Sequence, residues 1–356
     1  MRLSDFDYNL PENLIATHPV SPRDHSRLLV LNKHSGAIEH RHFYDFVEYL
    51  QKGDVLVLNN SKVVPARLVG KKVTGGKVEV FLHQLQGDNW QCLIGGKGMK
   101  AGMLIEFGNK KELTGKVEGD NNDGTFEISF DKHGKNFWKA VEILGEVPIP
   151  PYIKKQREFL NLNDVQKNDE HNYQTVYADD DKKGSVAAPT AGLHFTPELL
   201  QKIKGKGVQI EYVTLHVGLG TFAPVKVDDI KGHKMHSEFV EIRKEVLRRI
   251  VEAKVEERRI ISVGTTSARA LEAYAYNQKN FKLLNNVHSG LVNIFIYPGY
   301  EFKIVDAMIT NFHLPKSTLL MLISALAGTE NIKKAYTEAI KENYRFYSYG
   351  DGMFIN

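Results

Sequence analysis

The stretch Gly184-Ser-Val-Ala-Ala-Pro-Thr-Ala-Gly-Leu-His-Phe-Thr196 decides the fold, because the rest of the chain is arranged around it. Its residues are small and uncharged and follow neither a helical nor a strand period, which predicts a loop. Thr196 and Pro197 then form an N-cap and a first helical position, so a helix is predicted over residues 198–204. The free N–H groups of that helix start favour an anion near His194, although a plain tight connection explains an isolated loop equally well.

A strand is predicted directly after this helix, over residues 208–215, because β-branched and apolar residues dominate there. It leads into a second glycine-rich loop, His216-Val-Gly-Leu-Gly-Thr-Phe222. Ligands of α/β proteins bind on such loops, beyond the carboxyl ends of strands. Gly218-Leu-Gly220 is not a dinucleotide-binding fingerprint, since Pro224 follows and neither a helix nor a third glycine completes it.

Length and composition predict a cytoplasmic globular protein. The chain has 356 residues, enough for two or three domains, with 42% hydrophobic and 25% charged residues. Cys92 is the single cysteine, which excludes an internal disulfide and fits a reducing compartment. We expect no signal peptide and no membrane span, since the longest apolar run covers only residues 319–327. The net charge of +4 permits an anionic partner, although solvated surface explains the lysine clusters as well.

A change in the sequence pattern predicts an inserted domain. Residues 65–145 hold short strand candidates separated by Gly-rich turns, as in a small sheet or β-barrel. Patterns of an α/β unit lie on both sides, so residues 1–64 and 146–356 are predicted to form the main domain, with a stiff proline-rich linker at residues 147–152. Its predicted strands span residues 28–31, 55–58, 259–263, 294–297 and 304–307, its helices residues 243–257 and 319–327, and a polar loop residues 154–174.

Polar residues follow several predicted strands, which favours a ligand site. Asn59-Asn60-Ser61 ends one strand, and Gly264-Thr-Thr-Ser-Ala-Arg269 joins another to a helix, an arrangement that binds anions or hydroxyls. His236 and Glu238 share one face if their segment is a strand. The histidines are dispersed and lack the spacing of metal ligands, so neutral binding or acid–base histidines fit better than a metal centre. The histidines in question are His194, His216, His236 and His313.

Motifs along the whole chain together resemble one family. They include Pro22-Arg-Asp-His-Ser-Arg-Leu-Leu29, Ala188-Pro-Thr-Ala-Gly-Leu-His-Phe-Thr196, Leu215-His-Val-Gly-Leu-Gly-Thr-Phe222 and Thr310-Asn-Phe-His-Leu-Pro-Lys-Ser-Thr318. Residues 59–68, 147–153, 173–178, 235–238, 263–269 and 344–351 carry the others. Because the motifs match in order from end to end, the chain is identified as a member of the S-adenosylmethionine:tRNA ribosyltransferase-isomerase family of queuosine biosynthesis.

The resemblance implies an α/β-barrel main domain with an inserted small all-β domain that forms a β-barrel. This agrees with the change in sequence pattern at residues 65–145. It implies that S-adenosylmethionine serves as a ribosyl donor and that no metal is needed. The acceptor is then the aminomethyl group of 7-aminomethyl-7-deazaguanine at the wobble position of tRNAs with a GUN anticodon. The expected products are epoxyqueuosine in tRNA, adenine and methionine. We further expect a monomer in the cytoplasm, without a membrane partner.

This reaction places several demands on acid–base residues. A base must remove the ribose proton beside the sulfonium, an acid must assist the departing adenine, and the acceptor amine must lose a proton. Residue type and loop position make His194, His216 and His313 the predicted acid–base residues. Glu238 is the predicted carboxylate partner of the sulfonium or the amine.

Other residues of the same motifs are predicted to bind substrate. Arg67 and Arg269 are expected to hold the methionine carboxylate or a phosphate. The sequence departs from the family pattern at residues 59–62, where Asn-Asn-Ser-Lys stands in place of Asn-Asp-Thr-Arg, which removes a carboxylate at position 60. The remaining predicted substrate-binding residues are Asn59, Asn60, Ser61, Thr190, Gly192, Gly218, Gly220, Thr221, His236, Thr265, Thr266, Ser267, Tyr349 and Asp351.

Two other protein classes remain open. A methyltransferase that uses the same donor normally shows a glycine-rich loop after an early strand, and this chain has none. A non-catalytic RNA-binding protein would account for the mildly basic charge and the small β domain. It would not account for so many loops rich in His, Thr and Gly after buried strands.

Overall fold

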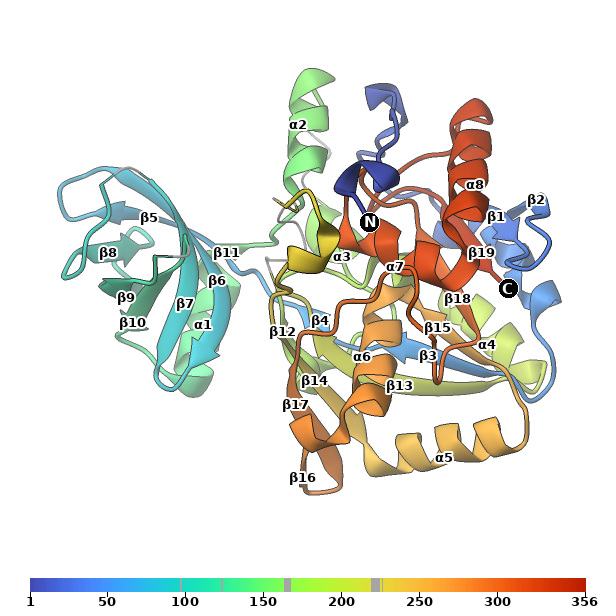
Figure 1. The fold of residues 1–356 in the computed structure, drawn as a ribbon. Coiled ribbons are helices and arrows are strands. Elements are labelled where there is room, and N and C mark those ends of the chain that lie inside the picture. Colours follow the sequence, from blue (N-terminus) through green and yellow to red (C-terminus); the bar gives the residue numbers. More distant parts are fainter. Residues whose placement is uncertain (97, 123, 163–167, 219–224, 226) are drawn as a thin grey trace.

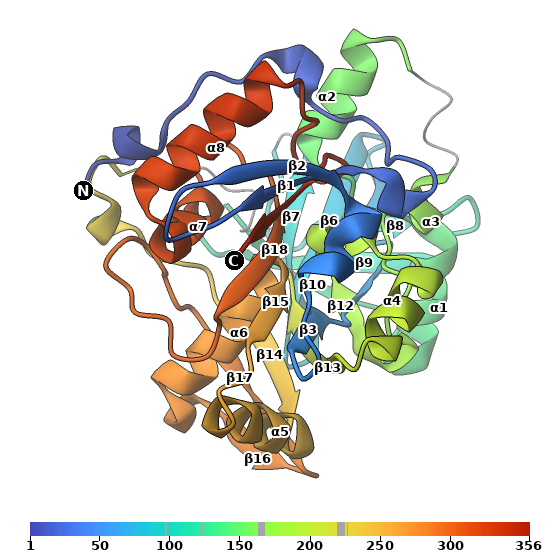
Figure 2. The same ribbon diagram turned by 90° about the vertical axis from the view of Figure 1, so that its right-hand side faces the viewer.

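A long mixed β-sheet forms the centre of the protein (Figures 1 and 2). The computed structural model describes residues 1–96, 98–122, 124–162, 168–218, 225 and 227–356. These described residues form a sheet of 10 strands. In spatial order the strands are β16 (Lys282–Leu284), β17 (Val287–Val292), β14 (Glu238–Arg243), β13 (Gln209–His216), β3 (Val55–Asn59), β15 (Ile260–Val263), β18 (Ala307–Asn311), β19 (Gly352–Ile355), β1 (Arg27–Leu31) and β2 (Ile38–His42).

The sheet is open, which corrects the α/β barrel that the resemblance implies. Its central strands β13, β3, β15 and β18 are parallel. Antiparallel strands flank them, with β14, β17 and β16 on one side and β19 next to β18 on the other. Among the described strands, β16 and β2 stand at opposite ends of the order and do not pair, so no closure occurs. Antiparallel additions at both edges therefore replace the repeated parallel strands that a barrel needs.

Helices cover both faces of this sheet, because its strands are apolar on both sides. In β3, Val55 and Val57 pack on one face, and Leu56 and Leu58 pack on the other. The first face carries α5 (Lys244–Val255), α6 (Gly264–Tyr276), α7 (Thr318–Ala327) and α8 (Thr329–Lys341). The second face carries η4 (Phe43–Tyr49), η7 (Thr190–His194) and α4 (Pro197–Gly205).

A closed antiparallel barrel projects from one side of this body (Figure 1), which confirms the predicted inserted β-barrel. In the described residues it runs β5 (Arg67–Lys72), β6 (Lys77–Gln86), β7 (Asn89–Gly95), β10 (Phe126–Phe130), β9 (Leu113–Asp120) and β8 (Leu104–Phe107), and β8 pairs back with β5. Helix α1 (Gly134–Leu144) packs its apolar residues into the barrel core. The predicted boundaries at residues 65 and 145 stay a prediction.

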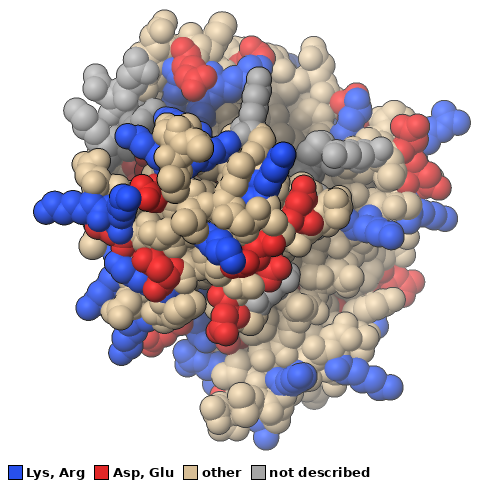
Figure 3. Space-filling view, turned by 90° about the vertical axis from the view of Figure 1, so that its left-hand side faces the viewer, with Lys and Arg blue, Asp and Glu red and all other residues tan. Residues whose placement is uncertain are grey.

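Short elements connect the barrel to the main body. β11 (Gly145–Glu146) pairs with β5, and β4 (Lys62–Val63) pairs with β12 (Lys183–Ser185). Viewed from the barrel side, lysines and arginines are intermingled with acidic residues rather than gathered in a patch of one sign (Figure 3). On this face the pattern agrees with solvated surface rather than with a basic patch.

Several predicted elements differ from the structure. The polar loop predicted at residues 154–174 contains α2 (Pro151–Phe159) and α3 (Asp169–Asn172), since Pro151 starts a helix at its first position instead of extending the linker. Residues 294–297 are not a strand, and β18 begins at Ala307 rather than at 304. Within the described residues, no helix is long and apolar enough to cross a membrane.

Candidate active site

The ends of seven strands place polar residues of distant sequence motifs at one edge of the central sheet. The described strands β3, β13, β15 and β18 are parallel, so their carboxyl ends, at Asn59, His216, Val263 and Asn311, lie at the same edge. Strands β14, β19 and β1 begin at this edge, as the pairing of Gly352 with Asn311 illustrates for β19. This is the edge where open α/β sheets bind ligands.

The loop over residues 184–196 packs across this edge. Its backbone is tied to the end of β13 by a hydrogen bond of 3.0 Å from the Val186 N–H to the Val217 carbonyl. The Thr190 hydroxyl donates to Asn311 Oδ1 at 2.8 Å, which joins the loop to the end of β18. The predicted cap is confirmed, since Thr196 Oγ1 accepts from the Leu199 N–H at 3.1 Å. Asp24 lies 3.2 Å from the same hydroxyl, where the sequence had suggested an external anion.

Two adjoining pockets, formed by described residues, open at this edge. The inner pocket has a volume of about 80 Å³ and is lined by the hydroxyl-bearing residues Thr190, Thr265, Thr266 and Thr310, and by Asn311 and His313. Its other walls include the aromatic residues Tyr152, Tyr173, Phe312 and Tyr347. Leu319 at the start of α7 lines both this pocket and the outer one. The inner pocket therefore combines aromatic faces with hydroxyl groups, a lining suited to a nucleoside or an organic cation.

His313 reaches the inner pocket from the segment after β18. Its Nε2 shares a hydrogen bond of 2.7 Å with the Thr310 hydroxyl, and its N–H donates to the Tyr336 hydroxyl at 2.8 Å. Burial lowers the pKa of His313 to about 3. The imidazole is therefore neutral at pH 7. The hydroxyl of Thr310 on β18 orients the ring, whereas the bond to Tyr336 on α8 is made by the backbone N–H of His313.

The outer pocket is built around a buried ion pair. Arg269 on α6 and Glu238 at the start of β14 are 5% exposed each, and Arg269 Nη1 donates to the Glu238 carboxylate. Arg269 Nε and Nη2 are buried, and neither has a hydrogen-bond partner among the described residues. Since an unpaired buried donor is unfavourable, these groups indicate a missing acceptor. His236 and Gly218, both predicted to bind substrate, line the same pocket.

The inserted barrel contributes His83 to the outer pocket, which the sequence did not reveal. The pairing of β6 with β7 is irregular between Leu82 and Gln84, and such a bulge turns a side chain out of the strand pattern. A Cβ on Gly218 would lie 2.7 Å from His83 Cε1, so only glycine allows this close approach. The single sequence signal was Gly218 itself, which gave no hint of its partner.

His194 is enclosed away from both pockets. Asn311 Nδ2 donates to its Nε2 at 3.3 Å, so Nδ1 carries the proton and donates to the Ser26 hydroxyl at 2.8 Å. The ring stacks on Phe43 with centroids 4.7 Å apart. Burial, and then the charges of Arg345 and Arg23, lower its pKa to about 3. With both nitrogens engaged, His194 holds β1, β18 and the loop together, which favours a positioning role.

The polar residues after β3 also bond within the protein. Asn59 Oδ1 accepts from the Leu215 N–H at 3.0 Å, and its Nδ2 donates to the Leu215 carbonyl at 2.9 Å. Asn60 accepts from the Thr214 hydroxyl at 2.7 Å and donates to Asp179 at 3.3 Å. The Asn60 side chain therefore makes two hydrogen bonds at the position where the family pattern has an aspartate. The neighbouring Lys62 pairs with Asp180. Ser61 Oγ is buried without a partner among the described residues.

The remaining predicted site residues lie around the pockets or elsewhere. Arg67 is not brought to the pockets, since its guanidinium pairs with Glu79 and Glu146 in the barrel. The ring of His216 at the end of β13 packs against Gly184, and burial lowers its pKa. The Ser267 hydroxyl donates to the Val263 carbonyl at the end of β15, and Gly192 contacts the Tyr177 hydroxyl. Tyr349 bonds Asp169, and Asp351 accepts the N–H groups of Arg27 and Arg345. Gly220 and Thr221 lie outside the described residues.

The whole chain is similar to known proteins of one family. Residues 3–355 match the family model described as "Queuosine biosynthesis protein". Proteins named S-adenosylmethionine:tRNA ribosyltransferase-isomerase from Acetivibrio thermocellus and Clostridioides difficile are 51% and 49% identical to this chain over 358 aligned positions, covering 100% of each protein. The crystal structure of S-adenosylmethionine tRNA ribosyltransferase from Thermotoga maritima matches with a TM-score of 0.55 and 38% identity, over 99% of this chain and 100% of that one.

The family and the enzyme class that the motifs predicted are confirmed by these full-length matches. The chain belongs to the queuosine biosynthesis protein family, among relatives named as S-adenosylmethionine:tRNA ribosyltransferase-isomerases.

Proposed function

We propose that this protein transfers and isomerises the ribosyl group of S-adenosylmethionine onto tRNA. In this proposal the acceptor is the aminomethyl group of 7-aminomethyl-7-deazaguanine at the wobble position of tRNAs with a GUN anticodon. Epoxyqueuosine-tRNA, adenine and methionine are the products, no metal takes part, and the enzyme works as a monomer in the cytoplasm. The observation that carries the proposal is the pair of adjoining pockets. One is aromatic and hydroxyl-lined, and the other holds an arginine with two donors that have no partner among the described residues.

The outer pocket supports binding of the methionine end of the donor. Glu238 holds Nη1 of Arg269, which leaves Nε and Nη2 as a parallel pair of donors. A carboxylate accepts such a pair bidentately, and an arginine is better suited to this than a lysine. The methionine carboxylate would satisfy both donors, each of which otherwise costs about 1–3 kcal/mol when buried and unpaired.

The inner pocket supports binding of the sulfonium and the ribose. Aromatic faces stabilise organic cations, and Tyr152, Phe312 and Tyr347 provide such faces next to the hydroxyl groups. Thr265 and Thr266 stand at the first turn of α6, where N–H groups and hydroxyls are available to ribose oxygens. Leu319 lines both pockets, which supports a donor bound with its two halves side by side.

His313 is assigned as the base for the ribose proton beside the sulfonium. Its low pKa keeps the ring neutral, which is the form that accepts a proton. The same shift makes it a weak base, and the neighbouring sulfonium compensates by acidifying the carbon. His313→Ala is expected to lower kcat about 100-fold or more, with little change in donor affinity. If kcat were unchanged and calorimetry showed intact binding of S-adenosylmethionine, His313 would not be the base.

The reaction itself is tested with a doubly labelled donor. S-adenosylmethionine carrying distinguishable labels in its ribose and its methyl group is incubated with tRNA that bears the aminomethyl-deazaguanine. Ribose label is expected to enter the tRNA, together with release of free adenine and methionine. Methyl label in the tRNA would establish a methyltransferase and refute the proposal. Binding of tRNA without movement of either label would favour the RNA-binding alternative.

A further inference from the structure

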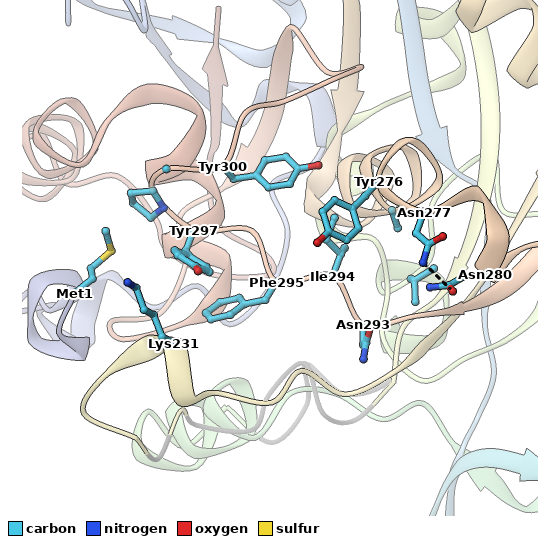
Figure 4. Close-up of a pocket in the computed structure, with 14 residues that line it drawn as sticks. Met1, Lys231, Tyr276, Asn277, Asn280, Asn293, Ile294, Phe295, Tyr297 and Tyr300 are labelled. Atoms are coloured by element: carbon cyan, nitrogen blue, oxygen red, sulfur yellow. Dashed lines mark hydrogen bonds between the residues drawn. The ribbon is translucent and has the colours of Figure 1, made fainter.

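A large aromatic cavity lies next to the outer pocket and takes no part in the chemistry above. It has a volume of about 730 Å³, within the size range of small-molecule sites. Figure 4 shows the rings of Tyr276, Phe295, Tyr297 and Tyr300 around it, with Lys231 at one side. Residues 294–297, which the sequence predicted as a strand, leave the sheet after β17 and form one of its walls.

The walls of this aromatic cavity are held in place. The Tyr300 hydroxyl donates to Glu272 Oε2 at 2.9 Å, and the buried Glu272 also accepts the N–H groups of residues 303–305. The rings of Phe295 and Tyr297 pack with centroids 4.9 Å apart. Tyr276, by contrast, is 66% exposed and offers its ring to an incoming group. Fixed rings beside an exposed one suit the stacking of a flat ligand, because little side-chain freedom is lost on binding.

The cavity continues the line of the active-site pockets. Along α6, Thr265 lines the inner pocket, Arg269 the outer pocket, and Ala273 and Asn277 the aromatic cavity. Thr265, Arg269 and Ala273 are four apart on one helix face, and each step advances about 6 Å along the axis, while Asn277 follows directly after the helix. The wall between the last two pockets is the ring contact of His233 with Phe295, with centroids 5.4 Å apart. A group held in the aromatic cavity therefore lies beside the outer pocket.

The charge of the cavity fits an anionic polymer. Its 14 described lining residues include Lys231 and no carboxylate. A second cation, Lys303 Nζ, lies 5.5 Å from the centre of the Tyr276 ring. Asn280 and Asn293 add amide groups that can bond the edge of a base. Aromatic faces with lysines at the rim are the combination that binds single-stranded RNA.

We propose that the aromatic cavity binds an unstacked base of the tRNA substrate, from a nucleotide adjacent to the one that is modified. This inference rests on the proposed function, because that function makes an anticodon loop the substrate. Loop bases can be splayed out and stacked on aromatic side chains, whereas bases of a duplex cannot. Insertion of the neighbouring base fixes the strand beside the outer pocket, so that the aminomethyl group of the modified base can reach the ribose of the donor.

The test measures binding of an anticodon stem-loop, in the absence of S-adenosylmethionine, by fluorescence anisotropy. Tyr276→Ala is expected to raise Kd about 5- to 150-fold, the range for loss of one stacked base. Tyr276→Trp retains a ring and is expected to bind nearly as the unmodified protein does. Tyr44→Ala removes another exposed aromatic ring, on η4, and is expected to leave Kd unchanged.

Stem-loops with single abasic nucleotides beside the modified position identify the base. At one of these positions the abasic stem-loop is expected to bind the unmodified protein weakly and to bind Tyr276→Ala no more weakly, because both changes remove the same stacking contact. Equal Kd values for Tyr276→Ala and the unmodified protein on the intact stem-loop would overturn the inference. The inference would also be overturned if Tyr276→Ala changed only the KM for S-adenosylmethionine. It would likewise be overturned if sedimentation showed that Tyr276→Ala alters the self-association of the protein. If the expected Kd values were observed but no ribosyl transfer occurred, the proposed function would fail while the inference about base binding would stand.

Discussion

At the scale of single residues, burial decides what the histidines can do. His194 was a predicted acid–base residue because it ends the loop on which the fold depends, yet its two nitrogens bond Ser26 and Asn311. His313 was predicted on the same grounds and lines the inner pocket. Sequence spacing could not distinguish them, because the difference lies in which residues of distant segments close over each ring.

A pH dependence of stability follows from the buried ring of His194. Its pKa falls from 6.5 to about 3 on folding, so the unfolded chain binds a proton between these pH values that the folded protein does not. The free energy of unfolding therefore decreases as pH falls from 6.5 towards 3, by about 1.4 kcal/mol per pH unit from this group. Urea unfolding at pH 6.5, 5.5 and 4.5 measures the slope, and His194→Gln is expected to flatten it by that amount.

Ser26→Ala serves as the control for this measurement. It removes the hydroxyl that accepts from His194 but leaves the titrating ring buried. We expect a free energy of unfolding lower by about 1 kcal/mol with an unchanged pH slope. An equal slope in His194→Gln and the unmodified protein would contradict the account of this residue.

At the scale of elements, the loop over residues 184–196 depends on contacts that its small residues permit. A Cβ on Gly192 would lie 1.8 Å from the Tyr177 hydroxyl, so Gly192→Ala is expected to destabilise the protein by about 1–3 kcal/mol. Gly205→Ala is the matched control, since no atom lies within 4 Å of its Cβ position. Both are compared by thermal unfolding.

A second substitution makes this prediction sharper. The Tyr177 hydroxyl is buried without a partner among the described residues, so Tyr177→Phe removes the clashing atom without loss of a hydrogen bond. In the Gly192→Ala background, Tyr177→Phe is expected to restore much of the lost stability. Additive destabilisation by the two substitutions would show that the loop is held in another way.

Most elements were predictable because their signals are local. Thr196 and Pro197 predict the start of α4. The apolar runs that form β1, β3 and β15 are buried on both faces of the sheet. Residues 294–297 carry the same β-branched and aromatic signal but find no strand partner among the described residues. The pairing of a strand is a tertiary property, so their place in a cavity wall could not be predicted from composition.

At the scale of the whole molecule, the inserted barrel meets the main body at the site. Its His83 approaches Gly218, a contact between segments that no local pattern relates. The order of the central sheet was also beyond prediction, since the antiparallel strands at its edges are decided by long-range pairing. An inserted β-barrel within an α/β unit was predictable at this scale, from the change in sequence pattern and from the family resemblance.

Arg67 illustrates how the barrel is anchored. Its guanidinium bonds Glu79 on β6 and Glu146 in β11, the strand that leads the chain back to the main body. Arg67→Met is expected to lower the unfolding midpoint and to leave the KM for S-adenosylmethionine unchanged, because all its contacts are within the barrel and its exit. An increased KM for the donor with an unchanged midpoint would instead return Arg67 to the predicted substrate-binding set.

The measurement that tests the central claim most directly is calorimetric binding of S-adenosylmethionine and of its carboxamide to the unmodified protein and to Arg269→Lys. Lysine preserves the charge pair with Glu238 but lacks the two unpaired donors of the arginine. The account predicts that the unmodified protein prefers the carboxylate about 10-fold or more, and that Arg269→Lys loses most of this preference. The same preference in both proteins would place the donor elsewhere and contradict the account.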